Sequence, residues 1–248
     1  MPFDALQDLP PEMLVVIAGA LLSSLVAGAV GFGDALVASA VWLHVLEPSQ
    51  ATPLVVGTGA LMHIIPLYLL RRSINPRRLA PFLAGGLMGV PVGVWALTQV
   101  SGEPLRAAVG LFLVVYGIYG LARPSVPRLA WAGWPADGAV GLASGVLGGL
   151  AGLSGILPTI WSEFRGWTPA ERRGVYQAFI FAMHVSALAL LLSRGAVQDG
   201  FGGRLIWCLP ALALGSWLGM TLFRRLDPVR FRQGVLALLL VSGVALLV

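Results

Sequence analysis

Apolar runs of about twenty residues recur from one end of this sequence to the other, enough for one helical crossing of a bilayer each. Of the 248 residues, 57% are hydrophobic and only 11% are charged. A soluble chain of this length would carry about twice that share of charge. The pattern therefore predicts an all-α polytopic membrane protein, with the lipid bilayer as its surroundings.

Proline and glycine punctuation divides the apolar sequence into eight segments. Two of them contain a glycine-rich interruption, Gly31-Phe32-Gly33-Asp34 in the first half and Gly152-Leu153-Ser154-Gly155 in the second. A helix broken inside a bilayer leaves backbone N–H and C=O groups unpaired, so such breaks persist only where protein or a cavity satisfies them. The eight segments are residues 11–46, 52–70, 79–98, 104–122, 138–162, 174–192, 205–223 and 230–248.

The two halves of the chain repeat each other. With an offset of 121, Gly31 falls on Gly152, and His63 falls on His184 (184 − 63 = 121). After an insertion near residue 200 the offset becomes 126, so that Gly89 meets Gly215 (215 − 89 = 126). This ordered series predicts a duplicated unit, with residues 1–124 as the first repeat and 125–248 as the second.

The sixteen arginines indicate how the repeats are oriented, because cytoplasmic loops collect basic residues. If all eight segments cross once, the best assignment divides the arginines eight against eight. If 11–46 and 138–162 are hairpins that return to the side they entered from, thirteen lie inside and only Arg106, Arg194 and Arg204 lie outside. We therefore predict two inverted repeats, each a re-entrant broken hairpin followed by three transmembrane helices, with both termini outside. Segment 138–162 is also long enough to be one tilted span.

The net charge, the single cysteine and the small residues indicate which partners and cofactors the protein can have. The formal net charge of +5 belongs to arginines at the ends of apolar runs, which indicates loop charge and no nucleic-acid surface. Cys208 is the single cysteine, which excludes an internal disulfide, and no Cys/His cluster has metal-ligand spacing. We accordingly expect no metal and no cofactor. The small-residue rows in segments 79–98 and 205–223 allow close helix contact and leave a homodimer open.

The chain resembles the sulfite exporter TauE/SafE family, also called the toluene sulfonate uptake permeases, over nearly its whole length. The resemblance lies in the two glycine-rich breaks and in the glycine-spaced third segments, which contain Gly85-Gly86-Leu87-Met88-Gly89 and Gly215-Ser216-Trp217-Leu218-Gly219. The Leu105-Arg106 and Phe231-Arg232 starts of the next segments also fit. The resemblance implies a bacterial inner-membrane carrier of sulfite, sulfonates or related sulfur-containing anions. Asp34 departs from the family pattern, because similar proteins usually continue with glycine there.

The residues expected to bind the substrate gather at the breaks and at the two histidines. Ionisable groups inside membrane helices usually face a cavity, and an inverted repeat would bring His63 and His184 together about its axis. An imidazole can donate to an anion and can carry a proton. Gln177 lies two helical turns from His184 and shares its face. The predicted binding residues are Gly31, Phe32, Gly33, Asp34, His63, Gly152, Leu153, Ser154, Gly155, Gln177 and His184.

Each of these predictions competes with a structural interpretation. Either histidine could be a buried neutral side chain that joins two helices. Asp34 could carry a proton, as could His63 and His184, or it could cap the helix that follows the break. Ser154 has the same ambiguity, although a hydroxyl and free N–H groups at a helix N-terminus favour an anion.

The sequence therefore predicts a secondary transporter of a small anion, sulfite-like or an organosulfonate, working by alternating access with a proton as one candidate for coupling. An anion channel of the same architecture is an alternative. A membrane-embedded lipid-phosphate hydrolase is the alternative from another class, but it needs clustered acids or a nucleophile with its base. Because Asp34 stands alone in the sequence, we expect no enzyme and no catalytic residue.

Overall fold

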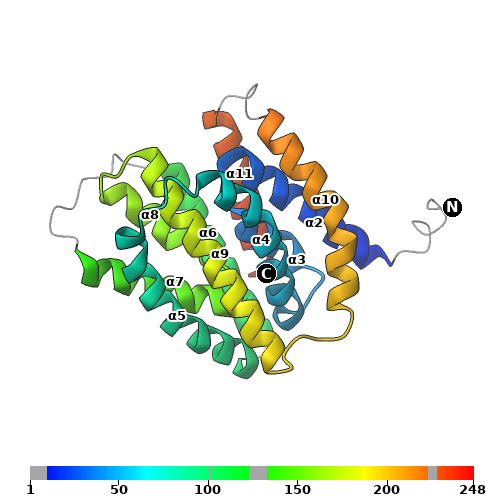
Figure 1. The fold of residues 1–248 in the computed structure, drawn as a ribbon. Coiled ribbons are helices and arrows are strands. Elements are labelled where there is room, and N and C mark those ends of the chain that lie inside the picture. The colour runs from blue at the N-terminus through cyan, green and yellow to red at the C-terminus, as the bar shows by residue number, and fades with distance from the viewer. Residues whose placement is uncertain (1–9, 101, 123–132, 223–227) are drawn as a thin grey trace.

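The computed structural model describes residues 10–100, 102–122, 133–222 and 228–248, and all regular structure in these ranges is helical (Figure 1). The predicted repeat boundary at 124/125 lies outside them. The helices in the predicted first repeat are α2 (Pro11–Val30), α3 (Asp34–Trp42), α4 (Pro48–Leu70), α5 (Pro76–Gln99) and α6 (Gly102–Ala122). Those of the second are α7 (Trp134–Ala151), α8 (Ile156–Phe164), α9 (Pro169–Ser193), α10 (Phe201–Leu222) and α11 (Pro228–Ala245).

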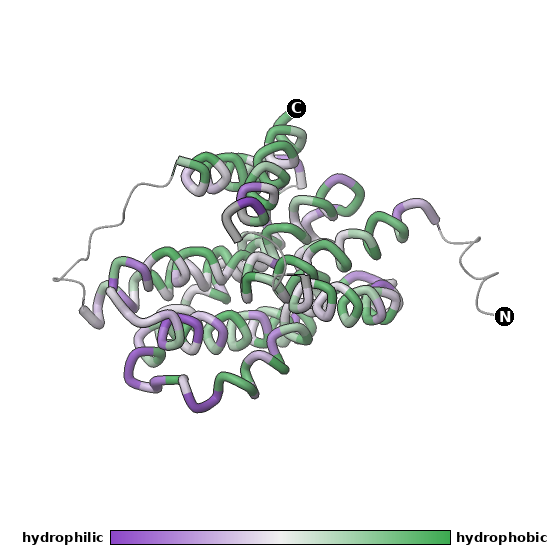
Figure 2. The backbone as a smooth tube through the Cα atoms, turned by 90° about the horizontal axis from the view of Figure 1, so that it is seen from above, coloured by the Kyte–Doolittle hydropathy of each residue, from purple (hydrophilic) through white to green (hydrophobic). Residues whose placement is uncertain are grey.

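Six described helices are long and apolar enough to cross a membrane: α2, α4, α5, α6, α9 and α10. Hydrophobic residues run along the helices, while the hydrophilic ones gather mostly at helix ends and turns (Figure 2). Large apolar side chains such as Ile65, Leu69 and Met88 are about 70% exposed, which suits a surface that faces lipid. The chain is an all-α polytopic membrane protein, as its sequence predicted.

Several helices begin earlier than predicted. The sequence analysis treated Pro48, Pro76 and Pro169 as breakers outside the apolar segments, whereas each is the first residue of its helix. Proline is favoured in that position, because its N–H group would have no partner there in any case. Asn75 and Thr168 then cap α5 and α9 with their side chains.

Both glycine-rich breaks interrupt a helix and turn it back as a hairpin. Gly31 ends α2 with φ 88° and Gly152 ends α7 with φ 75°, left-handed conformations that glycine adopts without strain. The end of α3 returns to α2, where the Trp42 Nε1 atom donates to the Val16 carbonyl at 2.9 Å. Segment 138–162 is likewise a hairpin and not a single tilted span.

In the second hairpin, Asp137 at the start of α7 holds the end of α8. Its Oδ1 atom accepts from Trp161 Nε1 at 2.7 Å, and its Oδ2 atom accepts from the Arg165 guanidinium at 3.2 Å. The arms of both hairpins are unequal. The nine residues of α3, like the nine of α8, make about 13 Å of helix at 1.5 Å per residue, well short of a membrane crossing.

The helices exchange partners between the two halves. The first hairpin arm of each half packs against the third long element of the other, so that α2 lies on α10 and α7 lies on α5 (Figure 1). Glycine rows allow these contacts: a Cβ atom at Gly89 would come within 2.2 Å of the Leu142 carbonyl oxygen, and one at Gly219 equally close to that of Leu25. The rows are therefore used inside the chain and do not form the dimer face that the sequence left open.

Apart from the short arms α3 and α8, the other helices pair with their counterparts, α4 with α9 and α6 with α11. Helices α4 and α9 run in opposite directions. Ser49 and Gln50 at the start of α4 bond to Gln198 beyond the end of α9, whereas Ser73 beyond the end of α4 packs on Gly174 near the start of α9.

Ion pairs of three described arginines lie at these two ends. At the end where α9 begins, Arg78 pairs with Glu171 at 2.8 Å and Arg172 pairs with Glu163 at 3.7 Å. At the opposite end, Arg106 pairs with Glu47 at 3.3 Å. Arg78 and Arg172 belong to the predicted inside group and Arg106 to the outside group, and which end faces the cytoplasm stays a prediction. Arg123, Arg128, Arg224 and Arg225 lie outside the described residues.

Candidate functional site

Asp34 is the first residue of α3 and is buried, with 4% of its surface exposed. Gly33 takes the cap position with φ 93°, so no side chain caps this helix. The Asp34 Oδ2 atom has no hydrogen-bond partner among the described residues. An unpaired buried carboxylate oxygen is costly, and capping of α3 does not account for it.

His63 of α4 lies between Asp34 and Gln177. Its Nε2 atom is 3.5 Å from Asp34 Oδ1, and its Nδ1 atom is 2.6 Å from Gln177 Oε1. The Gln177 amide nitrogen donates to the carbonyl of Gly31, which turns the amide oxygen toward the histidine. Because that oxygen can only accept, Nδ1 of His63 carries a hydrogen, and Nε2 is the nitrogen that faces the acid.

His184 of α9 is tied to the second break in a similar way. Its Nε2–H group donates to the carbonyl of Gly152 at 3.0 Å, since a carbonyl oxygen can only accept. This bond leaves Nδ1 as the nitrogen that faces the interior, where it is buried without a described partner. The rings of His63 and His184 lie 5.9 Å apart between centroids.

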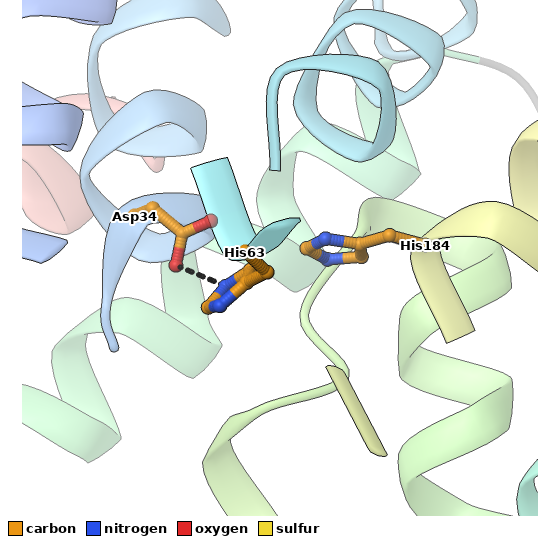
Figure 3. Close-up of side chains that lie close together, drawn as sticks. All are labelled: Asp34, His63 and His184. Carbon is orange, nitrogen blue, oxygen red and sulfur yellow. Dashed lines mark ion pairs between the residues drawn. The ribbon is translucent and has the colours of Figure 1, made fainter. Parts of the chain in front are cut away.

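The structure thus brings Asp34, His63 and His184 together from three different helices (Figure 3). One nitrogen or oxygen from each lies within 4.8 Å of the others, and all three residues are buried. The sequence analysis proposed each of them but did not expect this cluster as a ligand set, because the three positions have no local spacing that would reveal it.

The N-terminal turns of α3 and α8 line one small cavity beside this cluster. Gly33 and Asp34 contribute from one turn, Gly155 and Ile156 from the other, and His184 closes the side. The cavity measures about 10 Å³, room for roughly one water molecule. Helix N-termini carry a partial positive charge and unpaired N–H groups, so two of them at one cavity favour an anion.

The other predicted residues lie around this cavity. Leu153 is part of its lining, and Ser154 is fully buried with an Oγ atom that has no described partner. Phe32 lies at the edge, where its ring meets that of Tyr176 at 5.9 Å between centroids. All eleven predicted binding residues therefore lie at the two breaks or in direct contact with them.

A larger cavity of about 230 Å³ adjoins the small one. The two share Phe32, Gly33 and Leu36, and the larger cavity continues between Tyr116 and Tyr119 of α6 and Glu163 of α8. None of Asp34, His63 and His184 lines the larger cavity.

Arg173 is a residue that the sequence analysis undervalued. The sequence analysis counted it only as loop charge, but a Cβ atom at Gly31 would come within 2.5 Å of the Arg173 guanidinium. The exposed side chain therefore lies against the first break. Arg173 lies near the start of α9, 11 residues or about three helical turns before His184 (184 − 173 = 11). This spacing puts both residues on one face of the helix and could have identified Arg173 from the sequence.

An all-helical membrane protein in which two broken helices meet at a buried polar cluster has the architecture of a membrane transporter. A family model described as sulfite exporter TauE/SafE matches residues 15–246. The chain belongs to this family, whose members transport sulfur-containing anions such as sulfite across membranes. No curated protein and no solved structure matches the chain.

Proposed function

We propose that this protein is a secondary carrier of sulfite or a small organosulfonate in a bacterial inner membrane. The observation that carries the proposal is the cavity shared by the N-terminal turns of α3 and α8, with Asp34 and His184 at its wall. An oxyanion in this place would accept hydrogen bonds from N–H groups of both turns, and also from His184 Nδ1 when that nitrogen carries a proton.

Alternating access is supported by the sizes of the two cavities. The central cavity of about 10 Å³ is too small for sulfite, which has four non-hydrogen atoms, so the anion can enter only after the hairpin tips move. The opposed directions of α4 and α9 suit two inverted repeats that rock against each other, with both termini on the periplasmic side. A channel would need a continuous path instead.

A proton is the candidate coupling ion, and Asp34, His63 and His184 are the residues that would carry it. An ionised Asp34 would repel the anion, whereas a proton on the Asp34–His63 pair would cancel that charge. Import and export of the anion are both compatible with this arrangement. A second copy of the chain is a proposed partner through a surface other than the glycine rows.

Proteoliposomes test the proposal. We expect saturable uptake of radiolabelled sulfite, accelerated by a proton gradient and by unlabelled sulfite inside, because counterflow is a property of a carrier. His63→Ala and His184→Ala should each lower uptake at least tenfold. His44→Gln is the matched control, because His44 is exposed and its Nε2 atom bonds to Ser242 at 3.0 Å, away from the cluster.

The alternatives give different results. Non-saturating flux without counterflow would identify a channel. Uptake at the wild-type rate by both histidine variants would show that His63 and His184 are not needed for transport. Membership in a family of transporters agrees with a protein that is not an enzyme, and release of phosphate from lipid phosphates by the purified protein would contradict it.

A further inference from the structure

We propose that Asp34, His63 and His184 form a binding site for one divalent transition-metal cation of the zinc type. Two imidazoles and one carboxylate are a ligand set that such ions use, with a fourth position left open. The three candidate ligand atoms are buried and lie within 4.8 Å of one another. The metal site would extend the proposed function, because the role of the ion in anion transport rests on the protein being an anion carrier.

The outer nitrogens of both histidines are held in the way that metal-binding histidines require. His184 gives its Nε2–H group to the Gly152 carbonyl, and His63 gives its Nδ1–H group to Gln177. A bond of this kind fixes the tautomer, so that the other ring nitrogen presents a lone pair to the ion. Here those nitrogens are His63 Nε2, which lies 3.5 Å from Asp34 Oδ1, and His184 Nδ1, which lies beside Gly59 of α4.

The atoms that face the centre are also the ones whose hydrogen bonding is incomplete. His184 Nδ1, His63 Nε2 and Asp34 Oδ2 are all buried without a hydrogen-bond partner among the described residues. Such groups are rare in proteins and call for an explanation, of which an ion is one. Asp34 Oδ1 and His63 Nε2 are 3.5 Å apart, close to the roughly 3.3 Å between ligands in a tetrahedral zinc site.

The absence of a side chain at Gly59 leaves space for the cluster. A Cβ atom at Gly59 would lie 2.3 Å from His184 Nδ1 and 3.1 Å from Asp34 Oδ2. Glycine at this position of α4 therefore lets the imidazole and the carboxylate approach each other. Small inward rotations of the three side chains would complete the coordination.

Charge gives the ion a purpose in an anion carrier. With two neutral histidines the cluster carries one negative charge, which would repel sulfite. A bound divalent cation would take the place of the coupling proton on these side chains, because ligand atoms must be deprotonated. It reverses the sign to one positive charge and offers its open position to an oxygen or the sulfur of the anion. The N-terminal turns of α3 and α8 would then surround the remaining oxygens of the same anion.

Metal binding by the full-length protein in detergent tests the site. After treatment with a chelator and its removal, we expect isothermal titration with Zn²⁺ to give about one ion per chain. Asp34→Asn, His63→Gln and His184→Gln should each weaken binding at least tenfold, whereas His44→Gln should leave it unchanged. Absence of stoichiometric binding, or equal binding by all four variants, would overturn the proposal.

Cobalt gives a readout that needs no variant. Co²⁺ added to the metal-free protein should produce the strong visible absorption of a four-coordinate ion, and X-ray absorption should find two imidazole ligands. A six-coordinate spectrum with oxygen ligands alone would overturn the assignment. The result stands even where a substitution prevents folding.

Transport separates this site from the proposed function. Sulfite uptake that falls at least tenfold on chelation and returns with Zn²⁺ would support a role for the ion in anion binding. Unchanged uptake by the metal-free protein would overturn that role and leave the carrier function in place. Stoichiometric zinc binding without sulfite transport would leave the site in place and overturn the carrier function.

Discussion

The imidazole rings of His63 and His184 lie with centroids 5.9 Å apart and planes tilted by 55°, although 121 positions separate them in the chain. Each is linked to the carbonyl of the glycine that ends the first arm of a hairpin. His184 reaches Gly152 directly, and His63 reaches Gly31 through Gln177. The two breaks also differ by 121 (152 − 31 = 121), so the contacts repeat along with the residues. Movement of either hairpin tip would therefore move a histidine.

The glutamine bridge predicts a specific loss when Gln177 is replaced. Gln177→Ala removes the partner of the Gly31 carbonyl and of His63 Nδ1 together, and each unpaired buried group costs about 1–3 kcal/mol. We expect a lower unfolding temperature and at least tenfold slower sulfite uptake in proteoliposomes. The matched control is Gln198→Ala, which removes an exposed amide that bonds to Ser49 and Gln50. Equal behaviour of the two variants would contradict the bridge.

The close approach at Gly59 predicts a second effect. In Gly59→Ala the new methyl group would lie 2.3 Å from His184 Nδ1, so the ring must leave its bond to Gly152. Gly57→Ala, two residues earlier in α4, places a methyl group 3.2 Å from the edge of the Phe201 ring and leaves the cluster untouched.

We expect the Gly59 variant to lose at least tenfold in uptake rate, equivalent to about 1.4 kcal/mol. The Gly57 variant should retain more than half of the rate. Uptake in liposomes, normalised to reconstituted protein, is the measurement. An active Gly59 variant would mean that His184 does not need its present position.

Much of this fold could be predicted from residues alone, because membrane helices follow rules that sequence patterns display directly. Apolar length located the crossings, the arginines separated the hairpins from the spans, and the offset of 121 paired His63 with His184. The starts of α4, α5 and α9 were placed late, because a proline that begins a helix and one that ends it look alike in sequence.

The cluster could be predicted only in part. His63 and His184 stood out because imidazoles inside apolar runs are costly, and Asp34 stood out for the same reason. Their approach to within 4.8 Å depends on the packing of α3 between distant helices, which no spacing encodes.

Asp137 was missed for a related reason. It lies at the end of an apolar run, where an acid looks exposed, yet it is 1% exposed because Trp161 and Arg165 enclose it.

The turn at the second break predicts a difference between two glycines. Gly152 and Gly195 both have left-handed φ values, of 75° and 62°, so alanine costs about 1–2 kcal/mol at each. A Cβ atom at Gly152 would also lie 2.4 Å from Val55 Cγ1, whereas one at Gly195 would meet nothing within 4 Å.

Gly152→Ala should therefore lower the unfolding temperature in detergent further than Gly195→Ala does, by an overpacking penalty of about 1–3 kcal/mol. Sulfite uptake should fall only in the Gly152 variant, since its carbonyl holds His184. Equal unfolding temperatures for the two variants would show that the second break accommodates the methyl group beside Val55 without loss of stability.

Asp137 predicts how the second hairpin is held together. Asp137→Ala leaves Trp161 Nε1 and the Arg165 guanidinium without their acceptor, and loss of one partner of a buried charged pair costs about 3–5 kcal/mol. Arg165 is partly exposed, at 19% of its side chain, so water offsets some of this cost. Asp137→Asn keeps one oxygen for Trp161 and removes only the charge, so its unfolding temperature should fall between those of the wild type and the alanine variant. Thermal unfolding of the three proteins in one detergent is the measurement, and an asparagine variant as unstable as the alanine variant would assign the stability to the ion pair with Arg165 alone.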